Sequence, residues 1–385
     1  MISYGKQSIN QSDIDSVVNV LKSDFLTQGP QIPLFEKTVS DYCGSRYGVA
    51  VNSATSALHI ACLALGLEKG DYLWTSPNTF VASANCGLYC GAQIDFVDID
   101  LKTYNISIEE LEKKLIQAKK VNKLPKIIIP VHFSGQSCDM RKIHLLSQKY
   151  GFNIIEDASH AIGGKYLDKP IGGCQYSDIT VFSFHPVKII TTAEGGLATT
   201  NDKELLTRMQ LYRSHGVTRD PELMTKDIEG SWYYQQVDLG FNYRMTDLQA
   251  ALGISQMVRL DEFVSTRHKV RERYDLLLNG SRIIKPYQDK NSYSALHLYP
   301  IQIHFDDVGK SRLQVFNELR LNNIGVNVHY IPVHTQPFFY QFGFRLGDFP
   351  NTEAYYNKAI SIPIHSDMSV NQQDLVINTL NKIIN

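Results

Sequence analysis

Short apolar and β-branched runs alternate with helical patterns between residues 47 and 200 of the chain. The runs that predict strands are 47–51, 72–75, 94–97, 126–132, 153–156, 179–184 and 196–199. Helices are predicted at 55–65, 80–89, 107–118 and 139–150. Buried strands separated by helices are typical of an α/β domain built around a mostly parallel sheet. Ligands of such sheets bind at the carboxyl ends of the strands.

The flanking segments show a different organisation. Residues 1–45 carry two amphipathic helical patterns, and Ser12 with Asp15 resembles a capping box at the start of the first. In the last hundred residues, strands are expected at 298–304 and 326–328, and helices at 310–322 and from 370. We therefore expect three parts: a large domain with its N-terminal segment (1–245), a helical linker (246–284) and a small α+β domain (285–385).

Composition and charge are those of an ordinary globular protein, with 43% hydrophobic residues, 20% charged residues and a formal net charge of -1. This balance argues against a general affinity for nucleic acid or anionic membranes. No run approaches the ~20 apolar residues of a spanning helix, and the N-terminus has no apolar signal region. We expect a cytoplasmic protein with no nucleic-acid or membrane partner.

The six cysteines form no C-x-x-C pair, and no histidine lies at zinc-finger spacing from them. Cys86 and Cys90 are four residues apart and would share one helix face. That spacing fits one edge of a metal site, but packing as small apolar side chains is the commoner role of such cysteines. We predict no metal site, and the sequence leaves disulfides open.

The strongest chemical signal is the segment SDITVFSFHPVKIITTAEGG, residues 177–196. A predicted strand ends at 183–184, and Lys188 follows in a turn that contains a proline. A lysine at the carboxyl edge of a parallel sheet can lose hydration, acquire a lower pKa and act as a nucleophile towards a carbonyl group. A single loop lysine is usually only a solvated charge, so the prediction depends on its neighbours.

Three further segments place polar or aromatic residues after predicted strands. Asp157 follows the run 153–156 and is suited to face the ring nitrogen of pyridoxal phosphate (PLP), although a helix cap or a structural salt bridge is the ordinary alternative. Thr55 and Ser56 lie at a predicted helix start, where backbone N–H groups and hydroxyls can hold a phosphate. Phe80 follows the second strand and could stack on a planar ring, or be part of the core.

The fourth segment, DLGFNYRMTDLQAALG at residues 238–253, leads from a polar loop into a helix. Asn242 and Arg244 are polar groups in an otherwise apolar stretch, and helix capping by Thr246 is the alternative role of this segment. Each segment alone is a modest signal, but their order along the chain, with the lysine after the aspartate, is specific.

With these segments the sequence resembles the DegT/StrS-type sugar aminotransferases, which are fold-type I PLP enzymes. The resemblance extends from LTQGPQIPLFE (26–36) to NVHYIPVH (327–334). It is tightest with the branch of the family that serves pseudaminic acid synthesis, in WTSPNTFVASANCGLYCGAQIDFVDID, VHFSGQSCDM and FSFHPVK. The resemblance implies a large domain with a mostly parallel seven-stranded sheet and a smaller C-terminal domain.

The resemblance also implies roles for individual residues. Lys188 would carry the cofactor and move the proton, and Asp157 would pair with the pyridinium. The other implied cofactor contacts are Phe80 over the ring, His160 at the ring hydroxyl where relatives often carry Gln, and Thr55, Ser56 and Ser183 at the phosphate. Asn242 of a neighbouring subunit would also reach the phosphate, which implies a homodimer with shared active sites.

The implied substrates are a UDP-linked 4-keto-6-deoxy sugar and L-glutamate as amino donor. For the substrate contacts we propose Arg213, Arg244, His329, Tyr330 and His334, with a surface or domain-interface role as the alternative for the last three. Rival functions are a PLP-dependent sugar dehydratase, an aminotransferase for another nucleotide-linked keto sugar, and a non-catalytic PLP-binding regulator. The dehydratase branch would carry histidine at position 188, and a regulator would be expected to lack Lys188.

Overall fold

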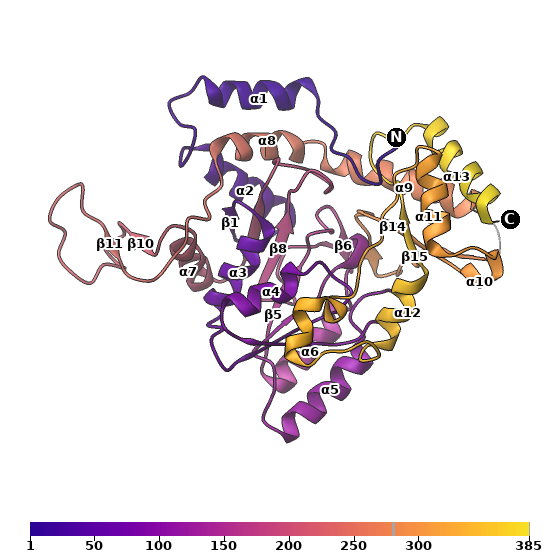
Figure 1. Ribbon diagram of the computed structural model, residues 1–385. Helices are drawn as coiled ribbons and strands as arrows, with labels where there is room; N and C mark the ends of the chain where they lie inside the picture. The colour runs from indigo at the N-terminus through magenta and orange to yellow at the C-terminus, as the bar shows by residue number, and fades with distance from the viewer. Residues whose placement is uncertain (279–281, 385) are drawn as a thin grey trace.

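A seven-stranded sheet forms the centre of the computed structural model, which describes residues 1–278 and 282–384 (Figure 1). Its strand order is β1-β9-β8-β5-β4-β2-β3. The strands are β1 (Tyr47–Val51), β2 (Tyr72–Thr75), β3 (Gln93–Phe96), β4 (Ile127–Ile129), β5 (Asn153–Asp157), β8 (Ile179–Ser183) and β9 (Gly196–Thr200).

Six strands of this sheet run in one direction, because only β9 pairs antiparallel with its neighbours β1 and β8. The carboxyl ends of the other six therefore lie at one edge of the sheet. The prediction of an α/β fold with a mostly parallel seven-stranded sheet is confirmed. All seven predicted strands are present, although the run 126–132 shortens to the three residues of β4.

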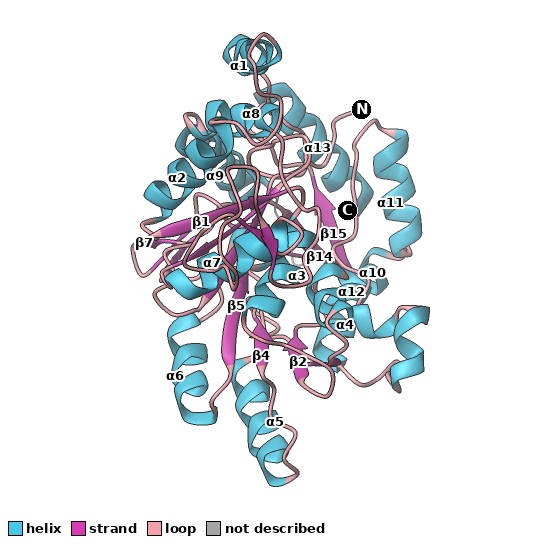
Figure 2. Cartoon of the chain, turned by 90° about the vertical axis from the view of Figure 1, so that its left-hand side faces the viewer, coloured by secondary structure: helices cyan, strands magenta, loops and turns pink. Residues whose placement is uncertain are grey.

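Helices cover both faces of the sheet (Figure 2). On one face lie α3 (Ala54–Ala64), α4 (Ala82–Tyr89) and α7 (Lys203–Arg213), and on the other α2 (Gln31–Cys43), α5 (Ile108–Lys120), α6 (Met140–Tyr150), α8 (Asp247–Met257) and α9 (Leu260–Leu277). Alternate residues of one strand serve the two cores: in β4, Ile127 and Ile129 pack with α3, whereas Ile128 packs with α5 and α6. The alternation of side chains along a strand thus assigns each buried residue to one of the two faces of the sheet.

A second core lies in the C-terminal part. The sheet β12-β14-β15 packs there against helices α11 and α13. Its elements are β12 (Ile283–Ile284), β14 (Tyr299–Ile303), α10 (Phe305–Val308), α11 (Arg312–Leu321), α12 (Pro350–Lys358), β15 (Ala359–Ile362) and α13 (Val370–Ile384). Ile2 belongs to this core as well, since its backbone bonds to Asn323 and Gly325. The first residues of the chain thus pack on its last part.

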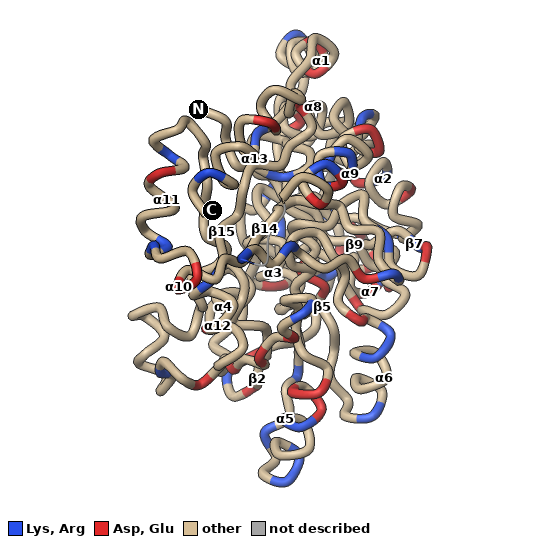
Figure 3. The backbone as a smooth tube through the Cα atoms, turned by 90° about the vertical axis from the view of Figure 1, so that its right-hand side faces the viewer, with Lys and Arg blue, Asp and Glu red and all other residues tan. Residues whose placement is uncertain are grey.

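The remaining elements are short or peripheral. Helix α1 (Gln11–Leu21) lies along α8, and the hairpin β10 (Val217–Thr218) with β11 (Gln235–Gln236) extends away from the body (Figure 1). A small sheet joins β6 (Lys165–Tyr166), β7 (Lys169–Pro170) and β13 (Ser292–Tyr293). The described residues also contain three 3₁₀ turns: η1 (Phe133–Gly135), η2 (Val333–Thr335) and η3 (Pro337–Phe342). Basic and acidic residues are interspersed along the chain on the side seen in Figure 3.

Several local predictions need correction. The first helix is capped by Asn10 with Asp13, not by Ser12 with Asp15, because the Asn10 side chain accepts the Asp13 N–H and the Asp13 carboxylate accepts the Asn10 N–H. Residues 326–328 form no strand, since only Asn327 bridges to Ser361. Strand β15 and the short sheets were missed. The expected linker 246–284 includes residues 279–281, which lie outside the described residues.

Cys86 lies in α4 and Cys90 caps its C-terminus. Among the described residues, no group of histidine, cysteine or acidic side chains has the geometry of a metal site, and all six cysteines are free thiols. None of the helices in residues 1–278 and 282–384 is long and apolar enough to cross a membrane.

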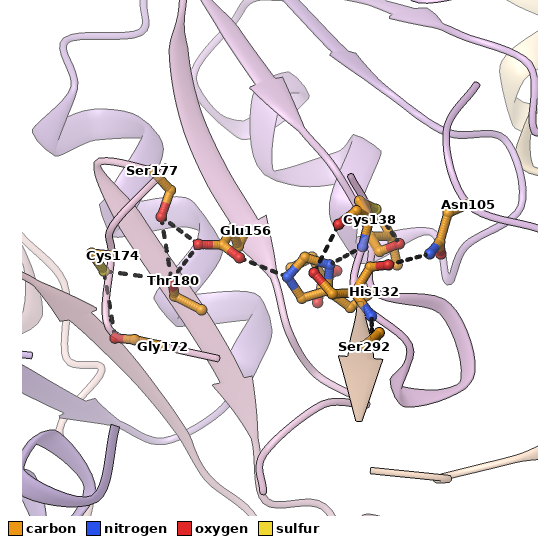
Figure 4. Close-up of polar contacts among 12 residues, drawn as sticks. Asn105, His132, Cys138, Glu156, Gly172, Cys174, Ser177, Thr180 and Ser292 are labelled. Carbon is orange, nitrogen blue, oxygen red and sulfur yellow. Dashed lines mark hydrogen bonds and ion pairs between the residues drawn. The ribbon is translucent and has the colours of Figure 1, made fainter. Parts of the chain in front are cut away.

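A buried polar network surrounds Glu156 of β5 (Figure 4). The preceding residue, Ile155, packs in the core with α3, so Glu156 points to the opposite face of the sheet. The Glu156 carboxylate accepts hydrogen bonds from Ser177 Oγ (2.5 Å) and Thr180 Oγ1 (3.0 Å), and it lies 2.7 Å from His132 Nε2. The Cys138 N–H donates to His132 Nδ1 (3.2 Å), so the imidazole proton is on Nε2 and is donated to Glu156. Every polar atom of this histidine ring therefore has a partner.

This network fixes the end of β5 next to the carboxyl edge of the sheet. The His132 N–H donates to the Asp157 carbonyl (3.0 Å), and the Asp157 N–H donates to the Pro130 carbonyl (2.9 Å). Burial raises the pKa of Glu156, but the His132, Ser177 and Thr180 hydrogen bonds outweigh it, and the net shift is downward. The carboxylate form is thus the one that the folded protein stabilises.

Replacing Glu156 by Gln should lower the free energy of unfolding by about 2 kcal/mol, since a buried charge-assisted hydrogen bond to His132 is weakened. Because the pKa of Glu156 is lowered on folding, its contribution is complete above the ordinary glutamate range and is lost as the pH falls towards the lowered value. Thermal unfolding from pH 7 to pH 4 measures both effects.

The matched control is Glu112→Gln, which removes an exposed ion pair with Lys149 (2.9 Å) and should change stability by less than about 0.5 kcal/mol. Equal melting temperatures for the two variants across this range would contradict a stabilising role of the Glu156 network.

Candidate active site

A cavity of about 870 Å³ lies at the carboxyl edge of the central sheet. Its walls come from the segments that follow β1, β2, β4, β5 and β8, together with Tyr4 and residues 327–330 of the C-terminal part. The predicted site residues that line it are Thr55, Ser56, Phe80, Asp157, His160, Ser183, Lys188, His329 and Tyr330. Parallel strand direction is what brings these distant segments together.

Lys188 lies in the turn after β8, where its N–H donates to the His185 carbonyl (2.8 Å). The next residues, Ile189 and Ile190, are buried and hold the turn against the body of the protein. Burial of the ammonium group lowers the pKa of Lys188 to about 8, against the opposing effect of the Asp157 carboxylate. A lysine of this kind carries far more free amine near neutral pH than an ordinary lysine and is a competent nucleophile.

Asp157 is the last residue of β5 and faces the same side of the sheet as α3. Ser83 Oγ donates to its Oδ2 (2.6 Å), and the Ser159 N–H donates to its Oδ1 (3.1 Å). Both oxygens are therefore held in place while the carboxylate still lines the cavity. Such an arrangement suits an acid that must hold a protonated ring nitrogen in a fixed position.

The start of α3 forms an anion cradle beside Lys188. Ser53 caps the helix by accepting the Ser56 N–H (3.1 Å), and no hydrogen-bond acceptor among the described residues meets the N–H groups of Ala54 and Thr55. Ser56 Oγ donates to Asn52 Oδ1 (2.7 Å), so its hydroxyl is partly engaged, and Ser183 completes the wall. Free N–H groups at a helix N-terminus are the common protein site for phosphate.

Close packing of strand β9 against the start of α3 makes this cradle possible. A Cβ at Gly196 would lie 2.4 Å from the Ser53 carbonyl carbon, so only glycine lets β9 approach the helix start. Gly196 therefore has a backbone-packing role at the cradle.

Aromatic and imidazole rings form the opposite wall of the cavity. Phe80 is 60% exposed, with its ring centroid 6.5 Å from that of Tyr330. His160 is buried, and its ring centroid lies 4.4 Å from that of His297. Burial lowers the pKa values of His160, His297 and His329, and Lys188 adds to each effect, so these three imidazoles are neutral at pH 7.

Four predicted site residues lie elsewhere. His334 is fully buried and bonds through Nε2 to Glu353 (2.8 Å), with its ring against Phe349. Arg213 pairs with Glu36 (2.5 Å) and donates to the Ala50 carbonyl (3.1 Å).

Asn242 and Arg244 belong to the segment before α8, outside the lining of their own chain's cavity. Arg244 joins β1 through a backbone bridge to Val51, and Asn242 is exposed. Among the described lining residues, Lys188 is the one lysine or arginine. Cations for additional phosphate groups must therefore come from beyond this lining.

Sequence reasoning missed several residues of the site, among them Tyr4, Ser83, Ser159, His297 and Asn327. Ser83 lies one helical turn beyond Thr79, whose hydroxyl is 2.9 Å from its own, so its place beside a strand-end aspartate could have been suspected. Tyr4, His297 and Asn327 come from segments whose packing on the large sheet no local pattern reveals.

The sequence matches the family described as the DegT/DnrJ/EryC1/StrS aminotransferase family over residues 7–381. Spore coat polysaccharide biosynthesis protein SpsC of Bacillus subtilis is 37% identical and covers 100% of this chain and 97% of its own. The UDP-4-amino-4,6-dideoxy-N-acetyl-beta-L-altrosamine transaminase of Campylobacter jejuni is also 37% identical and covers 100% of this chain and 98% of its own.

Solved structures share the whole fold. Helicobacter pylori PseC, an aminotransferase of pseudaminic acid biosynthesis, aligns with a TM-score of 0.90 and 30% identity over 100% of this chain and 99% of its own. Spr1654 of Streptococcus pneumoniae, in a PMP form, aligns with a TM-score of 0.89 and 29% identity over 100% and 99% of the two chains.

Without cofactor, the amine of Lys188 should react with acetic anhydride with a midpoint near pH 8, since burial lowers its pKa to about 8. Competitive labelling followed by peptide mass spectrometry measures the profile, with exposed Lys149, whose pKa is raised by Glu112, as the internal reference. Asp157→Asn should move the Lys188 midpoint further down, because the Asp157 charge raises it. A Lys188 profile equal to that of Lys149 would contradict this description of the site.

Proposed function

Because this chain belongs to the DegT/DnrJ/EryC1/StrS aminotransferase family, we propose that it aminates C4 of UDP-2-acetamido-2,6-dideoxy-β-L-arabino-hex-4-ulose. L-Glutamate is the donor, and the product is UDP-4-amino-4,6-dideoxy-N-acetyl-β-L-altrosamine, for pseudaminic acid synthesis. The class, a PLP-dependent sugar aminotransferase, follows from the family. The choice of sugar is supported by the Campylobacter and Helicobacter relatives. The observation that supports this proposal most directly is that Lys188 and Asp157 line one cavity beside the anion cradle.

The cavity residues fit PLP, group by group. The free N–H groups of Ala54 and Thr55, with the hydroxyls of Thr55 and Ser183, suit its phosphate. Asp157, held by Ser83 and Ser159, suits its ring nitrogen, and the Lys188 amine suits its aldehyde. Phe80 would cover the ring at the mouth of the cavity. Lys188 carries the one primary amine among the described lining residues, so no second lysine there competes for the aldehyde.

When bound, PLP supplies a protonated ring that withdraws electrons from the carbon atom next to the reacting nitrogen. The chain's own residues do the rest. Asp157 would keep the ring nitrogen protonated through an ion pair, and the free Lys188 amine would accept a proton from the donor α-carbon and return it to a neighbouring carbon. The lowered pKa of Lys188 suits this exchange, because near pH 8 the amine both accepts and releases a proton readily.

A second copy of the chain would complete the site. A UDP-linked substrate carries two phosphates, and the described lining of one cavity contains Lys188 as its one lysine or arginine. We assign Arg244 to the diphosphate and Asn242 to the cofactor phosphate of the neighbouring subunit, in a homodimer with shared active sites. Arg213 suits this role less well, because it already pairs with Glu36. On the sugar side we place His329 and Tyr330, which line the cavity, and not His334.

The second candidate function is amination of another nucleotide-linked keto sugar. It is favoured by the equal identity to SpsC, a protein of spore coat polysaccharide biosynthesis. A sugar dehydratase is disfavoured because position 188 is lysine, and a non-catalytic regulator because Lys188 lines a preformed cavity with Asp157.

The purified protein with PLP and L-glutamate should convert the L-arabino 4-keto sugar to its 4-amino product and form one 2-oxoglutarate per amine. Lys188→Ala should abolish conversion, and Asp157→Asn should lower kcat/KM by at least about a hundredfold, since a lost ion pair to the ring weakens electron withdrawal. Mass spectrometry of the sugar measures the product.

The D-xylo isomer of the sugar serves as the matched alternative substrate. Amination of the D-xylo isomer alone would retain the enzyme class and reject the proposed sugar. Absence of any Lys188-dependent reaction or visible cofactor absorbance would reject the enzymatic proposal itself.

Shared sites predict complementation between two inactive variants. The Lys188→Ala homodimer should be inactive and the Asn242→Ala homodimer weak, whereas a heterodimer places both defects in one site and leaves the other intact. After subunit exchange of equal amounts, activity should reach about a quarter of the wild-type value, because half of the dimers carry one good site. A mixture no more active than its components would mean that Asn242 acts within its own subunit.

A further inference from the structure

A chain of three hydrogen bonding groups crosses the wall of the cavity. The Ser134 N–H donates to His160 Nδ1 (3.2 Å), and His160 Nε2 lies 3.0 Å from the Tyr330 hydroxyl oxygen. The three residues come from the 3₁₀ turn after β4, the turn after β5 and the C-terminal part. They connect the large sheet with the segment that closes the cavity.

The direction of the protons in this chain is determined. A backbone N–H can only donate, so His160 Nδ1 is an acceptor and carries no proton. Burial keeps His160 neutral, so its single proton is on Nε2 and is donated to the Tyr330 oxygen. The Tyr330 hydroxyl proton therefore remains for another acceptor, and Tyr330 lines the cavity.

The turn that starts the chain is held firmly. Ser134 Oγ donates to the Leu298 carbonyl (2.6 Å), and its own carbonyl accepts the His297 N–H (2.9 Å). Gly135 follows at φ +97°, and a Cβ there would lie 2.8 Å from both the His160 carbonyl oxygen and the Leu296 nitrogen. The His297 ring packs on the His160 ring at 4.4 Å. The imidazole of His160 therefore has little freedom to turn its donor elsewhere.

We propose that the Tyr330 hydroxyl, oriented by Ser134 and His160, is the hydrogen-bond donor to the phenol oxygen of the PLP ring. This inference rests on the proposed function. The resemblance led us to expect residue 160 at that oxygen, but here the one donor of His160 is already directed at Tyr330. With Asp157, Lys188 and the α3 cradle assigned to the nitrogen, the aldehyde and the phosphate, the phenol oxygen is the remaining polar substituent of the ring.

A donor at this oxygen stabilises its anionic form. It therefore lowers the pKa at which the visible absorbance of PLP bound to Lys188 changes, here called the absorbance pKa. The titratable groups near the Tyr330 hydroxyl and the ring site are Tyr4, Asp157, Lys188 and three buried histidines, His160, His297 and His329. His185 and Glu194, both more exposed, also line the cavity, and Tyr355, whose hydroxyl donates to the His329 carbonyl, lies close to Tyr330. The three histidines are neutral near pH 7. Burial, Asp157 and Tyr4 raise the pKa of Tyr330, so it keeps its proton in the titration range.

The test is a pH titration of the visible absorbance of PLP-loaded protein. Tyr330→Phe should raise the absorbance pKa by about one unit, as expected for loss of a hydrogen bond to a charged oxygen. His160→Gln should stay near wild type, because an amide can accept from Ser134 and donate to Tyr330. His160→Leu should raise the pKa by less than Tyr330→Phe, and should add nothing in the double variant.

Tyr4→Phe is the matched control, since Tyr4 also lines the cavity but is not bonded to His160; its absorbance pKa should equal that of the wild type. An unchanged pKa in Tyr330→Phe would overturn the proposal. The proposal would also be overturned if adding His160→Leu to Tyr330→Phe raised the absorbance pKa by a further full unit. That result would mean that residue 160 contacts the phenol oxygen directly.

Phe at position 330 keeps the ring packing against Phe133 and Phe80, so this variant should fold. If His160→Leu does not fold, Tyr330→Phe against Tyr4→Phe still decides the outcome. The proposed function is rejected if the wild-type protein shows no visible absorbance band, or only bands that are still present in Lys188→Ala. A wild-type band unaffected by Tyr330→Phe would reject the donor role alone.

Discussion

The alternation of side chains along β5 is the constraint on which the site depends. Asp157 faces α3 and the cavity, whereas Glu156, one residue earlier, faces the opposite side and enters the His132 network. A shift of one residue in strand register would exchange the two carboxylates. The buried Glu156 network therefore does more than stabilise the core: it specifies which acid reaches the cavity, because Glu156 has exact partners on its own face.

The electrostatics of the cavity follow from what its walls contain. Lys188 is partly desolvated, Asp157 is held by two donors, and the buried imidazoles of His160, His297 and His329 carry no charge near pH 7. Such a cavity has few fixed charges of its own, so each charged group of a ligand meets one particular partner. The α3 N-terminus contributes fixed dipoles where a phosphate would lie, without adding a cation close to Lys188.

Packing between the large sheet and the C-terminal part gives the cavity its second wall. The turn at Ser134–Gly135 is bonded to residues 295–298, and Tyr330 reaches His160 from the other side. Polar groups of both parts thus satisfy one another within the cavity wall. Because unpaired polar groups in such a place are costly, these bonds also define how the two parts sit together.

The sequence by itself determined the architecture of the large sheet and the chemistry at its edge. Strand and helix periodicities differ, so all seven strands could be placed, and residues at or shortly after the ends of parallel strands, such as Asp157 and Lys188, had to meet at one edge. Only the tertiary structure decided which side chains complete the walls. It brought in Tyr4, His297 and Asn327, and it engaged Arg213 and His334 with Glu36 and Glu353. The reason is physical: local periodicity fixes which face a residue points to, whereas its partner across an interface depends on segments far away in the chain.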